Sequence, residues 1–372
     1  MKNKIIIIIF LILLYIPSFI WFLFGDKMVG ENLENRTLAS KPLFEIDNIS
    51  DYPVLYEAYY NDHLPFKNYA VKFVSYTDYK LFKTVTSNKV ILGDDNWLFY
   101  KSAEEVALDD EKPIDDYQGI NKYGETEKQL IFDNIETVNS FFKGRDIEFS
   151  ILICPNKESI YHEYLPNSIK QIDNTRKIDE LILYLNNNST VPVLYPYDEL
   201  MEKKDMFPLY YKYDTHWNEL GGFIAAQEIV ECYKGEKTDI SKCKIVESEL
   251  EPPRDLAGML NMNDVFDDDV RYCVNDYKDN VNLNLIESTP DGILHVYNSN
   301  ATDKRRIMVI RDSYGEALMP YLSKEFSDVI YVHRNGFDQG FIDVYQPDIV
   351  VYQVVERATN DLFDLKMIFQ LN

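Results

Sequence analysis

The sequence predicts an α/β protein in which helices cover both faces of a mostly parallel sheet, preceded by one apolar N-terminal helix. Short hydrophobic strands alternate with amphipathic helical segments from about residue 126 onward, which is typical of parallel sheets. The composition is that of a folded protein, with 372 residues, 46% hydrophobic and 27% charged, which excludes disorder as the main state. The length allows one large or two medium domains.

The charge balance limits the class of partner. The chain has 38 Lys and Arg against 62 Asp and Glu, a formal net charge of −24. This acidity argues against nucleic acid as a ligand, because phosphate binding needs a basic face. It also argues against docking on anionic lipid headgroups.

The first element is an uncharged run from residue 5 to residue 24, preceded by Lys2 and Lys4. As a helix it is about 30 Å long, the thickness of the hydrocarbon core of a bilayer. A cleaved signal peptide would show a shorter apolar stretch and a small-x-small cleavage site. We therefore expect an uncleaved single-pass signal anchor, with the N-terminus in the cytoplasm and the remainder outside the cell membrane.

Three divisions follow along the chain. Residues 1–25 form the anchor, and residues 26–125 form a tether and a small N-terminal layer of helices and strands. This layer includes aromatic residues at helical spacing over 51–85, a turn into a strand over 96–100 and a charged loop over 104–125. Residues 126–372 form the larger domain, with an irregular acidic insertion at about 235–300 in which short strands are expected near 244–249 and 292–297.

This larger domain contains the alternating elements. Helices are expected over 126–144, 177–185, 218–234 and 315–326, and strands over 148–154, 191–195, 306–310, 328–332 and 348–354. The buried stripe of the first helix should hold Leu130, Ile131, Ile135, Val138 and Phe141 or Phe142. Asn218 is the expected cap of the third helix. In such folds, sites lie at the carboxyl ends of the strands.

The first candidate for chemistry is Asp214-Thr215-His216, just before the helix over 218–234. In an extended turn, residues i and i+2 project to the same side, so Asp214 can orient the imidazole through Nδ1. Nε2 is then left as a base. The alternative is a surface pair or a structural histidine, because Asp-x-His recurs by chance.

The second candidate is Ser313, where the strand over 306–310 runs through Arg311-Asp312 into a helix. Its hydroxyl is expected at the carboxyl edge of the sheet, and its N–H at a helix N-terminus that can hold an oxyanion. The alternative is a plain helix cap. A weak serine nucleophile beside an Asp–His base predicts acyl transfer or ester hydrolysis.

These residues resemble a known family. Asp214-Thr215-His216-Trp217-Asn218 ahead of a strand ending in Asp312-Ser313 is similar to the SGNH-hydrolase-like O-acetyltransferases of the alginate acetylation type (AlgX/AlgJ-like, the DHHW family). Further stretches match in the same order: Glu34-Asn35-Arg36-x-Leu38, residues 60–67, residues 96–100, Pro155-Asn156-Lys157 through Leu165-Pro166, and residues 347–357. The resemblance implies a flavodoxin-like SGNH fold with a circularly permuted order of motifs, in which Asp-x-His comes before the serine and not after it.

The resemblance places the triad on Ser313 as nucleophile, His216 as base and Asp214 as the residue that orients it. The sequence departs from the family at Arg311, because SGNH enzymes usually have Gly before Asp-Ser. Arg311 either narrows the oxyanion turn or supplies a cation to substrate. Tyr314 and Asn335 are the candidates for completing the oxyanion hole, and with Arg311 and Trp217 they make up the expected substrate-binding residues.

Other features receive structural interpretations. We expect Lys157 to be a solvated loop lysine, with a position that reaches the site as the alternative. Arg357 is expected to pair with Glu356, with a ligand contact as the alternative. Trp97 and Trp217 suit stacking on sugar rings, although core packing has the greater weight. The four cysteines (Cys154, Cys232, Cys243 and Cys273) leave disulfide pairing open. The acidic run over 264–269 lacks the spacing of a calcium loop, and no metal or other cofactor is expected.

The residues alone predict acyl transfer or ester hydrolysis outside the cell, and the resemblance implies an extracytoplasmic polysaccharide O-acetyltransferase acting on an exopolysaccharide such as alginate or a bacterial cellulose. Because acetyl-CoA is absent outside the cell, the resemblance implies a multi-spanning membrane O-acyltransferase partner (the MBOAT type) that delivers the acetyl group. Two alternatives remain: an acetylesterase with the same triad, and a non-catalytic protein that binds or assembles polysaccharide. The acidity of the ectodomain fits a neutral or cationic glycan better than an anionic one.

Overall fold

The computed structural model describes residues 2–24, 38–44, 49–101, 111–248 and 254–371. The predicted motif Glu34-Asn35-Arg36, most of the predicted tether and residues 104–110 of the predicted charged loop lie outside these residues. The loop prediction is wrong for part of the remainder, because Pro113–Gln118 form the helix α4, with Pro113 at its first position. The chain divides into two units, one made of Met1–Val90 with Arg254–Asp267 and the other of Ile91–Pro253 with Asp268–Asn372.

The first unit is helical. The apolar helix α1 (Lys2–Phe24) is long and apolar enough to cross a membrane over Lys4–Phe24. A signal sequence can have the same length and apolar composition. The helical layer predicted over 51–85 is confirmed. It consists of α2 (Tyr52–Asp62), α3 (Lys67–Thr77) and a π-helical turn, η3 (Asp78–Phe82), and the unit also holds α10 (Asp255–Met259).

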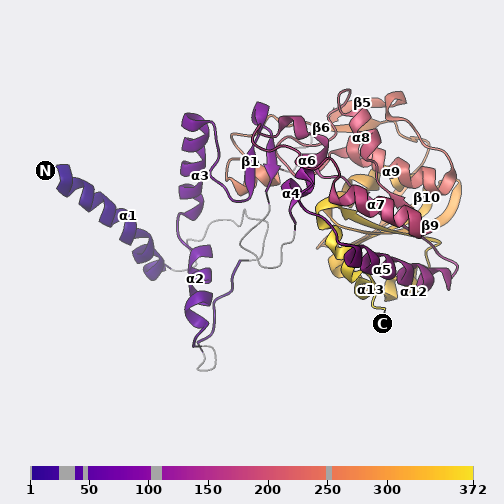
Figure 1. The fold of residues 1–372 in the computed structure, drawn as a ribbon, viewed down its shortest axis with the longest axis horizontal. Coiled ribbons are helices and arrows are strands. Elements are labelled where there is room, and N and C mark those ends of the chain that lie inside the picture. Colours follow the sequence, from indigo (N-terminus) through magenta and orange to yellow (C-terminus); the bar gives the residue numbers. More distant parts are fainter. Residues whose placement is uncertain (1, 25–37, 45–48, 102–110, 249–253, 372) are drawn as a thin grey trace. The chain divides into compact units, whose positions relative to one another are not determined.

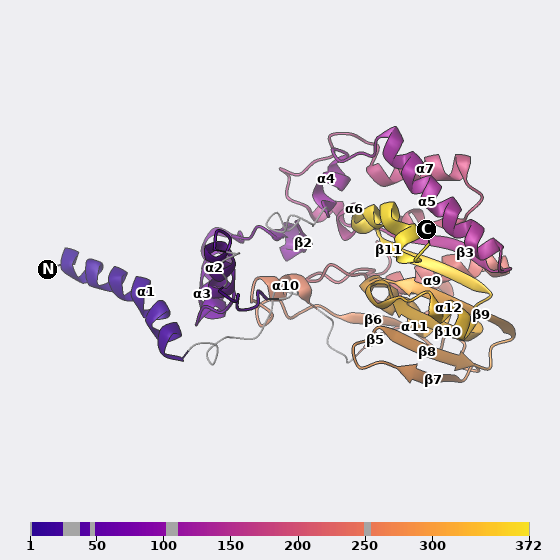
Figure 2. The ribbon, with the colours of Figure 1, turned by 90° about the horizontal axis from the view of Figure 1, so that it is seen from below.

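The second unit is built on a seven-stranded sheet with the order β4-β3-β11-β9-β10-β8-β7. The first five strands in this order pair in parallel, and β8 and β7 add an antiparallel edge, so the predicted mostly parallel sheet is confirmed (Figure 2). The strands are β3 (Glu148–Cys154), β4 (Val193–Leu194), β7 (Leu283–Ser288), β8 (Leu294–Ser299), β9 (Asp303–Arg311), β10 (Phe326–His333) and β11 (Ile349–Val355).

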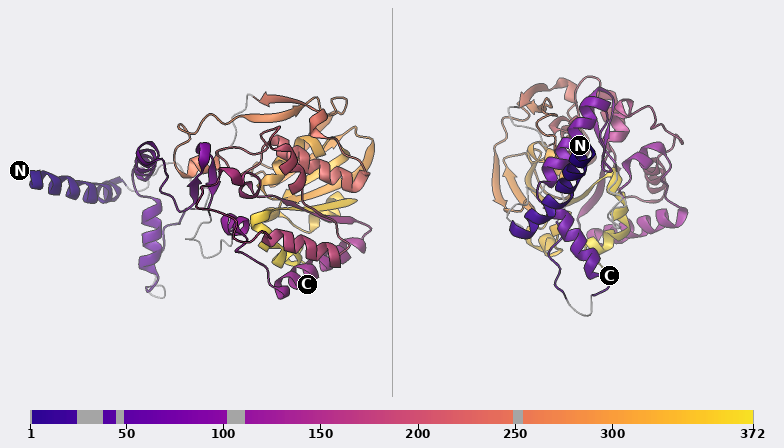
Figure 3. Two further views of the ribbon diagram at one scale, coloured as in Figure 1. Left: turned by 45° about the horizontal axis from the view of Figure 1, so that its top comes forward. Right: turned by 90° about the vertical axis from the view of Figure 1, so that its left-hand side faces the viewer.

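Helices cover both faces of this sheet, as predicted (Figure 3). Helix α9 lies on one face, and α5, α12 and α13 lie on the other (Figure 1). The main helices are α5 (Glu125–Lys143), α7 (Lys177–Asn188), α8 (Tyr197–Lys203), α9 (Glu219–Lys234), α11 (Met319–Leu322), α12 (Gly340–Tyr345) and α13 (Leu365–Ile368). Shorter elements are β1 (Val90–Leu92), β2 (Leu98–Tyr100), α4 (Pro113–Gln118), α6 (Lys157–Ile160), η7 (Ser313–Leu318), η8 (Arg334–Gly336) and η9 (Glu356–Asp364).

The amphipathic stripes mostly bury the residues that the spacing predicted. Along α5, Ile131, Ile135, Val138 and Phe142 are fully buried, but Leu130 is 46% exposed, so its inclusion in the stripe was wrong. Leu130 lies about 100° around the helix from Ile131, which carries it past the edge of the stripe. In α9 the predicted cap is confirmed, because the Asn218 side chain accepts hydrogen bonds from the N–H groups of Leu220 and Gly221.

Two parts of the sequence prediction differ from the structure. In the segment over 235–300, the short strands expected near 244–249 and 292–297 are confirmed as β5 (Lys244–Ser248) and β8. The segment is more regular than expected, because β5 pairs with β6 (Arg271–Asn275), and β7 and β8 extend the central sheet. The helix expected over 315–326 begins as the 3₁₀ element η7 and ends at Leu322 in α11. Pro320 in the first turn of α11 has no N–H, which interrupts the hydrogen-bond series between the two.

Candidate active site

A short hairpin presents the Asp214–His216 pair. Tyr210 and Trp217 form an antiparallel bridge, and the N–H of Asn218 donates to the carbonyl of Leu209 at 2.9 Å. The chain between these pairs forms a tight loop that leads directly into the N-terminus of α9. Strand β2 supports the loop from the side, because the N–H of Leu98 donates to the Lys212 carbonyl at 3.1 Å.

Within the loop, the Asp214 carboxylate contacts His216 twice. Its Oδ1 lies 2.6 Å from Nδ1 of the imidazole and accepts the His216 backbone N–H at 2.9 Å. Asp214 is fully buried, whereas the His216 side chain is 22% exposed. An ionised carboxylate can only accept, so Nδ1 carries the proton and Nε2 has a free lone pair.

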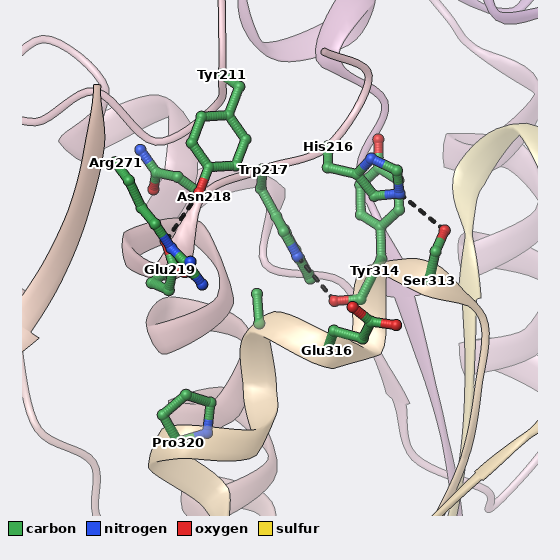
Figure 4. A pocket seen from close by; sticks show the side chains of 11 residues that line it. Tyr211, His216, Trp217, Asn218, Glu219, Arg271, Ser313, Tyr314, Glu316 and Pro320 are labelled. Carbon is green, nitrogen blue, oxygen red and sulfur yellow. Dashed lines mark hydrogen bonds and ion pairs between the residues drawn. The ribbon is translucent and has the colours of Figure 1, made fainter. Parts of the chain in front are cut away.

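The nucleophile candidate lies at the end of this series. Nε2 of His216 is 2.8 Å from Oγ of Ser313 (Figure 4). The three predicted triad residues are therefore within hydrogen-bond distance of one another in series, although Asp214 and Ser313 are far apart in the sequence. Ser313 is exposed, so its hydroxyl is accessible to a substrate.

Asp312 fixes the turn that carries Ser313. Its carboxylate accepts hydrogen bonds from the N–H groups of Tyr314 at 2.9 Å and Val355 at 2.7 Å, and from the amide of Gln353 at 2.8 Å. The Gln353 carbonyl accepts the Asp312 N–H at 3.0 Å in return. Ser313 is the first residue of η7, and the first N–H groups of a helix have no partner within the helix.

A glycine allows the two halves of the site to approach. At Gly222 in α9, a Cβ atom would lie 2.4 Å from Cβ of Ala317 and 2.5 Å from its carbonyl oxygen in η7. Any side chain at this position would push α9 away from η7. Because α9 follows His216 and η7 begins at Ser313, this close approach sets the distance between the imidazole and the hydroxyl.

Tyr314 and Trp217 pack the wall behind the imidazole. The Tyr314 ring lies 4.8 Å from the His216 ring, and its hydroxyl donates to the Thr215 carbonyl at 2.5 Å. Trp217, 2% exposed, donates its indole N–H to the Tyr314 carbonyl at 3.0 Å. Both residues also line the hollow in front of Ser313, but most of their surface is committed to packing.

This hollow has a volume of about 360 Å³ and holds polar groups on the side away from His216 and Ser313. There, Glu219 accepts hydrogen bonds from Arg271 and from the Tyr211 hydroxyl, the latter at 3.0 Å (Figure 4). A second hollow of about 590 Å³ shares Arg271, Glu316 and Pro320 with the first. The sequence analysis missed Arg271, because it lies in a segment interpreted as an irregular insertion.

The structure does not bring two of the expected substrate-binding residues into this hollow. The Arg311 guanidinium is buried and donates to the carbonyls of Gly292 at 3.0 Å and Asp312 at 3.2 Å. Burial lowers the pKa of Arg311 from its usual value. Asn335, exposed in η8 at the end of β10, is not among the lining residues. Arg311 thus fastens the Ser313 turn to the loop before β8.

The solvated position expected for Lys157 is wrong. The Lys157 side chain is buried, and its ammonium donates to three carbonyl oxygens: those of Leu98 at 2.6 Å, Lys212 at 2.9 Å and Asp214 at 2.8 Å. Through these hydrogen bonds, the Lys157 ammonium group connects β2 to the loop that carries the Asp–His pair. The sequence offered one signal for this role, the position of Lys157 just after a buried strand at the carboxyl edge of the sheet.

Other predicted contacts have different partners. Arg357 donates to the Glu111 carboxylate at 2.9 Å and to the Tyr314 hydroxyl at 3.2 Å, and not to Glu356. From the acidic run, Asp269 accepts the Tyr213 N–H at 3.0 Å, and burial raises the pKa of its carboxyl. The four cysteines all carry free thiols.

The fold is an α/β domain with a mostly parallel sheet, and a serine and an Asp–His pair lie at the carboxyl edge of that sheet. Residues 90–342 match the family model described as an SGNH hydrolase-like domain, acetyltransferase AlgX. The chain therefore belongs to the AlgX-type family of SGNH hydrolase-like acetyltransferases. No curated protein matches the sequence.

Two solved structures share the fold. A DHHW family protein from Eubacterium siraeum is 16% identical with a TM-score of 0.54, and the match covers 77% of this chain and 97% of that one. PatB1 from Bacillus cereus, solved with a sulfonyl adduct, is also 16% identical with a TM-score of 0.52, covering 74% of this chain and 99% of that one. At this identity the likeness concerns the fold.

Proposed function

We propose that this protein is a serine-dependent O-acetyltransferase that moves an acetyl group to a hydroxyl of a polysaccharide outside the cell. Membership in the AlgX-type family supports an O-acetyltransferase acting on a polysaccharide. The observation that carries the serine mechanism is the hydrogen-bond series from Asp214 through His216 to Ser313, with distances of 2.6 and 2.8 Å.

The first half of the reaction loads the enzyme. Nε2 of His216 takes the hydroxyl proton as Oγ of Ser313 attacks the carbonyl carbon of an acetyl ester. Asp214 stabilises the imidazolium that forms. When the bond to the donor oxygen breaks, the proton passes from Nε2 to that oxygen, leaving acetyl-serine and a free donor hydroxyl.

The second half transfers the group. A sugar hydroxyl in the hollow gives its proton to Nε2 as its oxygen attacks the acetyl carbon, and the bond to Oγ breaks as Ser313 regains the proton. The backbone N–H of Ser313, at the start of η7, stabilises the oxyanion in both halves. If water attacks in place of the sugar, the same residues give an esterase.

The walls of the two hollows suit a neutral or cationic acceptor. Glu219 pairs with the guanidinium of Arg271, and Glu316 lies 3.3 Å from the guanidinium of Arg311, so both carboxylates of the lining are balanced and, among the described residues, no unpaired cation lines the hollows to attract a polyanion. The two hollows are neighbours with three lining residues in common, and the second is also lined by Tyr297 on β8. An extended glycan with hydroxyl or amino groups fits this lining better than a polyanion.

The acetyl donor and the location complete the proposal. We assign α1 as an uncleaved anchor in the cell membrane, with the catalytic unit on the extracytoplasmic side. A multi-spanning membrane O-acyltransferase of the MBOAT type then supplies the acetyl group, since acetyl-CoA is absent from that side. The chain's own residues supply the nucleophile, the base and the oxyanion donor, and the proposed mechanism uses no other cofactor.

The test is acetyl turnover from an activated acetyl ester, with and without an oligosaccharide acceptor. A transferase should give acetylated oligosaccharide, and Ser313→Ala should lower acyl turnover by about 10³-fold or more. Ser168→Ala, at an exposed serine, is the matched control and should keep full turnover. Hydrolysis unaffected by any acceptor would instead make the protein an esterase, and full activity of Ser313→Ala would end the serine mechanism.

A further inference from the structure

We propose that α3 and η3, extended to Phe66–Lys83, form an interfacial element that lies on the membrane surface and binds anionic phospholipid headgroups. The inference rests on the proposed function in one respect, the assignment of α1 as a membrane anchor. It adds a second membrane contact, made by a surface helix outside the catalytic unit.

An aromatic stripe runs along one side of this element. Phe66, Tyr69, Phe73 and Tyr76 recur at intervals of three and four residues, which places them on one face of the helix. Their exposed fractions are 44%, 76%, 73% and 44%. Leu81 and Phe82, 71% and 69% exposed, continue the apolar surface through η3. Large contiguous apolar surfaces of this kind mark sites of protein or membrane interaction.

Another face of the same helix is occupied within its own unit. The Asn68 carbonyl accepts a hydrogen bond from the Asn261 side chain, and Lys72 forms an ion pair with Asp264 at 2.7 Å. The Tyr79 ring lies 5.1 Å from that of Phe266. The helix therefore has a defined packing face, and the aromatic stripe lies on a different side of it.

The local charge is opposite to that of the whole chain. Residues 66–83 contain four lysines and one acidic residue, Asp78, in a protein with a net charge of −24. Lys67 pairs with Asp62 at 3.8 Å and Lys72 with Asp264 at 2.7 Å, so the local excess of positive charge comes from Lys80 and Lys83. Charges are screened over about 8 Å at physiological salt, so the local lysines decide what this surface attracts. The total charge therefore does not exclude an anionic surface here. Basic residues flanking an aromatic face are typical of interfacial helices.

The contacts of α1 place this unit at the membrane. Trp21, near the end of the apolar helix, lies 6.1, 6.2 and 5.2 Å from the rings of Tyr56, Tyr59 and Tyr60 in α2. Ser18 and Tyr60 also share a hydrogen bond of 2.6 Å. Trp and Tyr concentrate where membranes meet water. Only residues 63–66 separate α2 from α3, so α3 begins within a short distance of that interface. Lipid is therefore the occupant that fits the stripe.

The experiment uses the full chain in lipid nanodiscs, with a photo-crosslinking benzoylphenylalanine in place of Phe73. The same group in place of Leu183, a 64% exposed residue of α7 in the catalytic unit, is the matched control. With phosphatidylglycerol discs, mass spectrometry should find lipid adducts at position 73 at least about fivefold above those at position 183. Lys80→Glu with Lys83→Glu should lower this yield by about tenfold.

Two results would overturn the proposal: adducts at position 73 that join it to protein instead of lipid, and equal lipid yields from phosphatidylglycerol and phosphatidylcholine discs. The same group in place of Leu13, 69% exposed in α1, separates the inference from the anchor. Lipid adducts at position 13 without any at position 73 would reject the interfacial element alone. Removal of residues 1–24 by processing would reject the anchor, and with it this inference.

Discussion

Lys157 offers a demanding test of how the site is held, because its side chain touches no substrate in the proposed mechanism. Replacing it in Lys157→Met keeps the length of the side chain and removes the charge. Three carbonyl oxygens, those of Leu98, Lys212 and Asp214, then lose a charged donor at 2.6 to 2.9 Å. The loop that carries the Asp–His pair then loses the hydrogen bonds that connect it to β2 through Lys157.

The magnitude follows from these three bonds. A hydrogen bond to a charged group contributes about 1.5–3 kcal/mol, but the cost of burying the ammonium offsets part of the total. We expect a loss of about 3 kcal/mol in the free energy of unfolding. A shift of about 1 Å in a catalytic group costs about 10²-fold in rate, so kcat for an acetyl ester should fall by about that factor. KM should change little, since Lys157 is not in the lining of the hollow.

The measurement combines denaturant unfolding with steady-state kinetics on the folded variant. Lys204→Met is the matched control, because the Lys204 ammonium donates to the Ile160 carbonyl at 2.6 Å and pairs with Glu163, away from the Asp–His loop. It should lose stability without losing kcat. A folded Lys157→Met protein with kcat within about threefold of the wild type would refute the positioning role.

Three further predictions concern other parts of the molecule. Asp214→Asn should lower acyl turnover by about 10³-fold or more without unfolding the chain, because the amide permits the wrong tautomer of His216. Arg271→Met should raise KM for an oligosaccharide acceptor while leaving hydrolysis of a small acetyl ester within about threefold, since Arg271 lines the hollow away from Ser313. Burial raises the pKa of Asp116 to about 6 despite its pairing with Lys177 at 3.2 Å. A carboxyl with a raised folded-state pKa stabilises the protein at low pH, and this contribution, up to about 3 kcal/mol, is lost as pH rises from about 4 to about 6. Urea unfolding of Asp116→Asn should therefore show a smaller loss of stability over that pH interval than the wild type.

Each of these three predictions has a result that would contradict it. Kinetics of Asp214→Asn within tenfold of the wild type would remove the orienting role. An unchanged acceptor KM in Arg271→Met would take Arg271 out of the acceptor site. Parallel pH profiles for Asp116→Asn and wild type would mean that the Asp116 pKa is ordinary, and Asp364→Asn, at an exposed aspartate, serves as the control.

The parts of the fold that depend on local pattern were predictable from the sequence. β3 occupies the predicted residues, and α5 and α9 begin and end within one residue of their predicted bounds, because each combines a strong hydrophobic period with a clear start or stop. The proximity of Asp214 and His216 also followed from their spacing alone. In the antiparallel edge of the sheet, β8 was expected as a short strand near 292–297, but β7 was not predictable in the same way, since it is exposed along most of its length.

The side chains that the sequence placed wrongly are those whose environment comes from distant segments. The three carbonyls around Lys157 come from two segments of the chain distant from it, and no local feature announces a buried cation. Arg311 is buried beside the carbonyl of Gly292, which only the pairing of β8 with β10 brings near. Arg271 reaches the hollow because β6 lies against α9, a contact that the sequence does not encode locally.

The most direct test of the central claim is covalent capture of the nucleophile. The full chain is treated with a small sulfonyl fluoride, and the modified residue is located by peptide mass spectrometry. The account predicts a single sulfonyl adduct on Ser313, absent in Ser313→Ala and slowed by at least about 10²-fold in His216→Ala. Modification of another residue, or labelling of Ser313 at an equal rate without His216, would contradict the proposal that His216 activates Ser313.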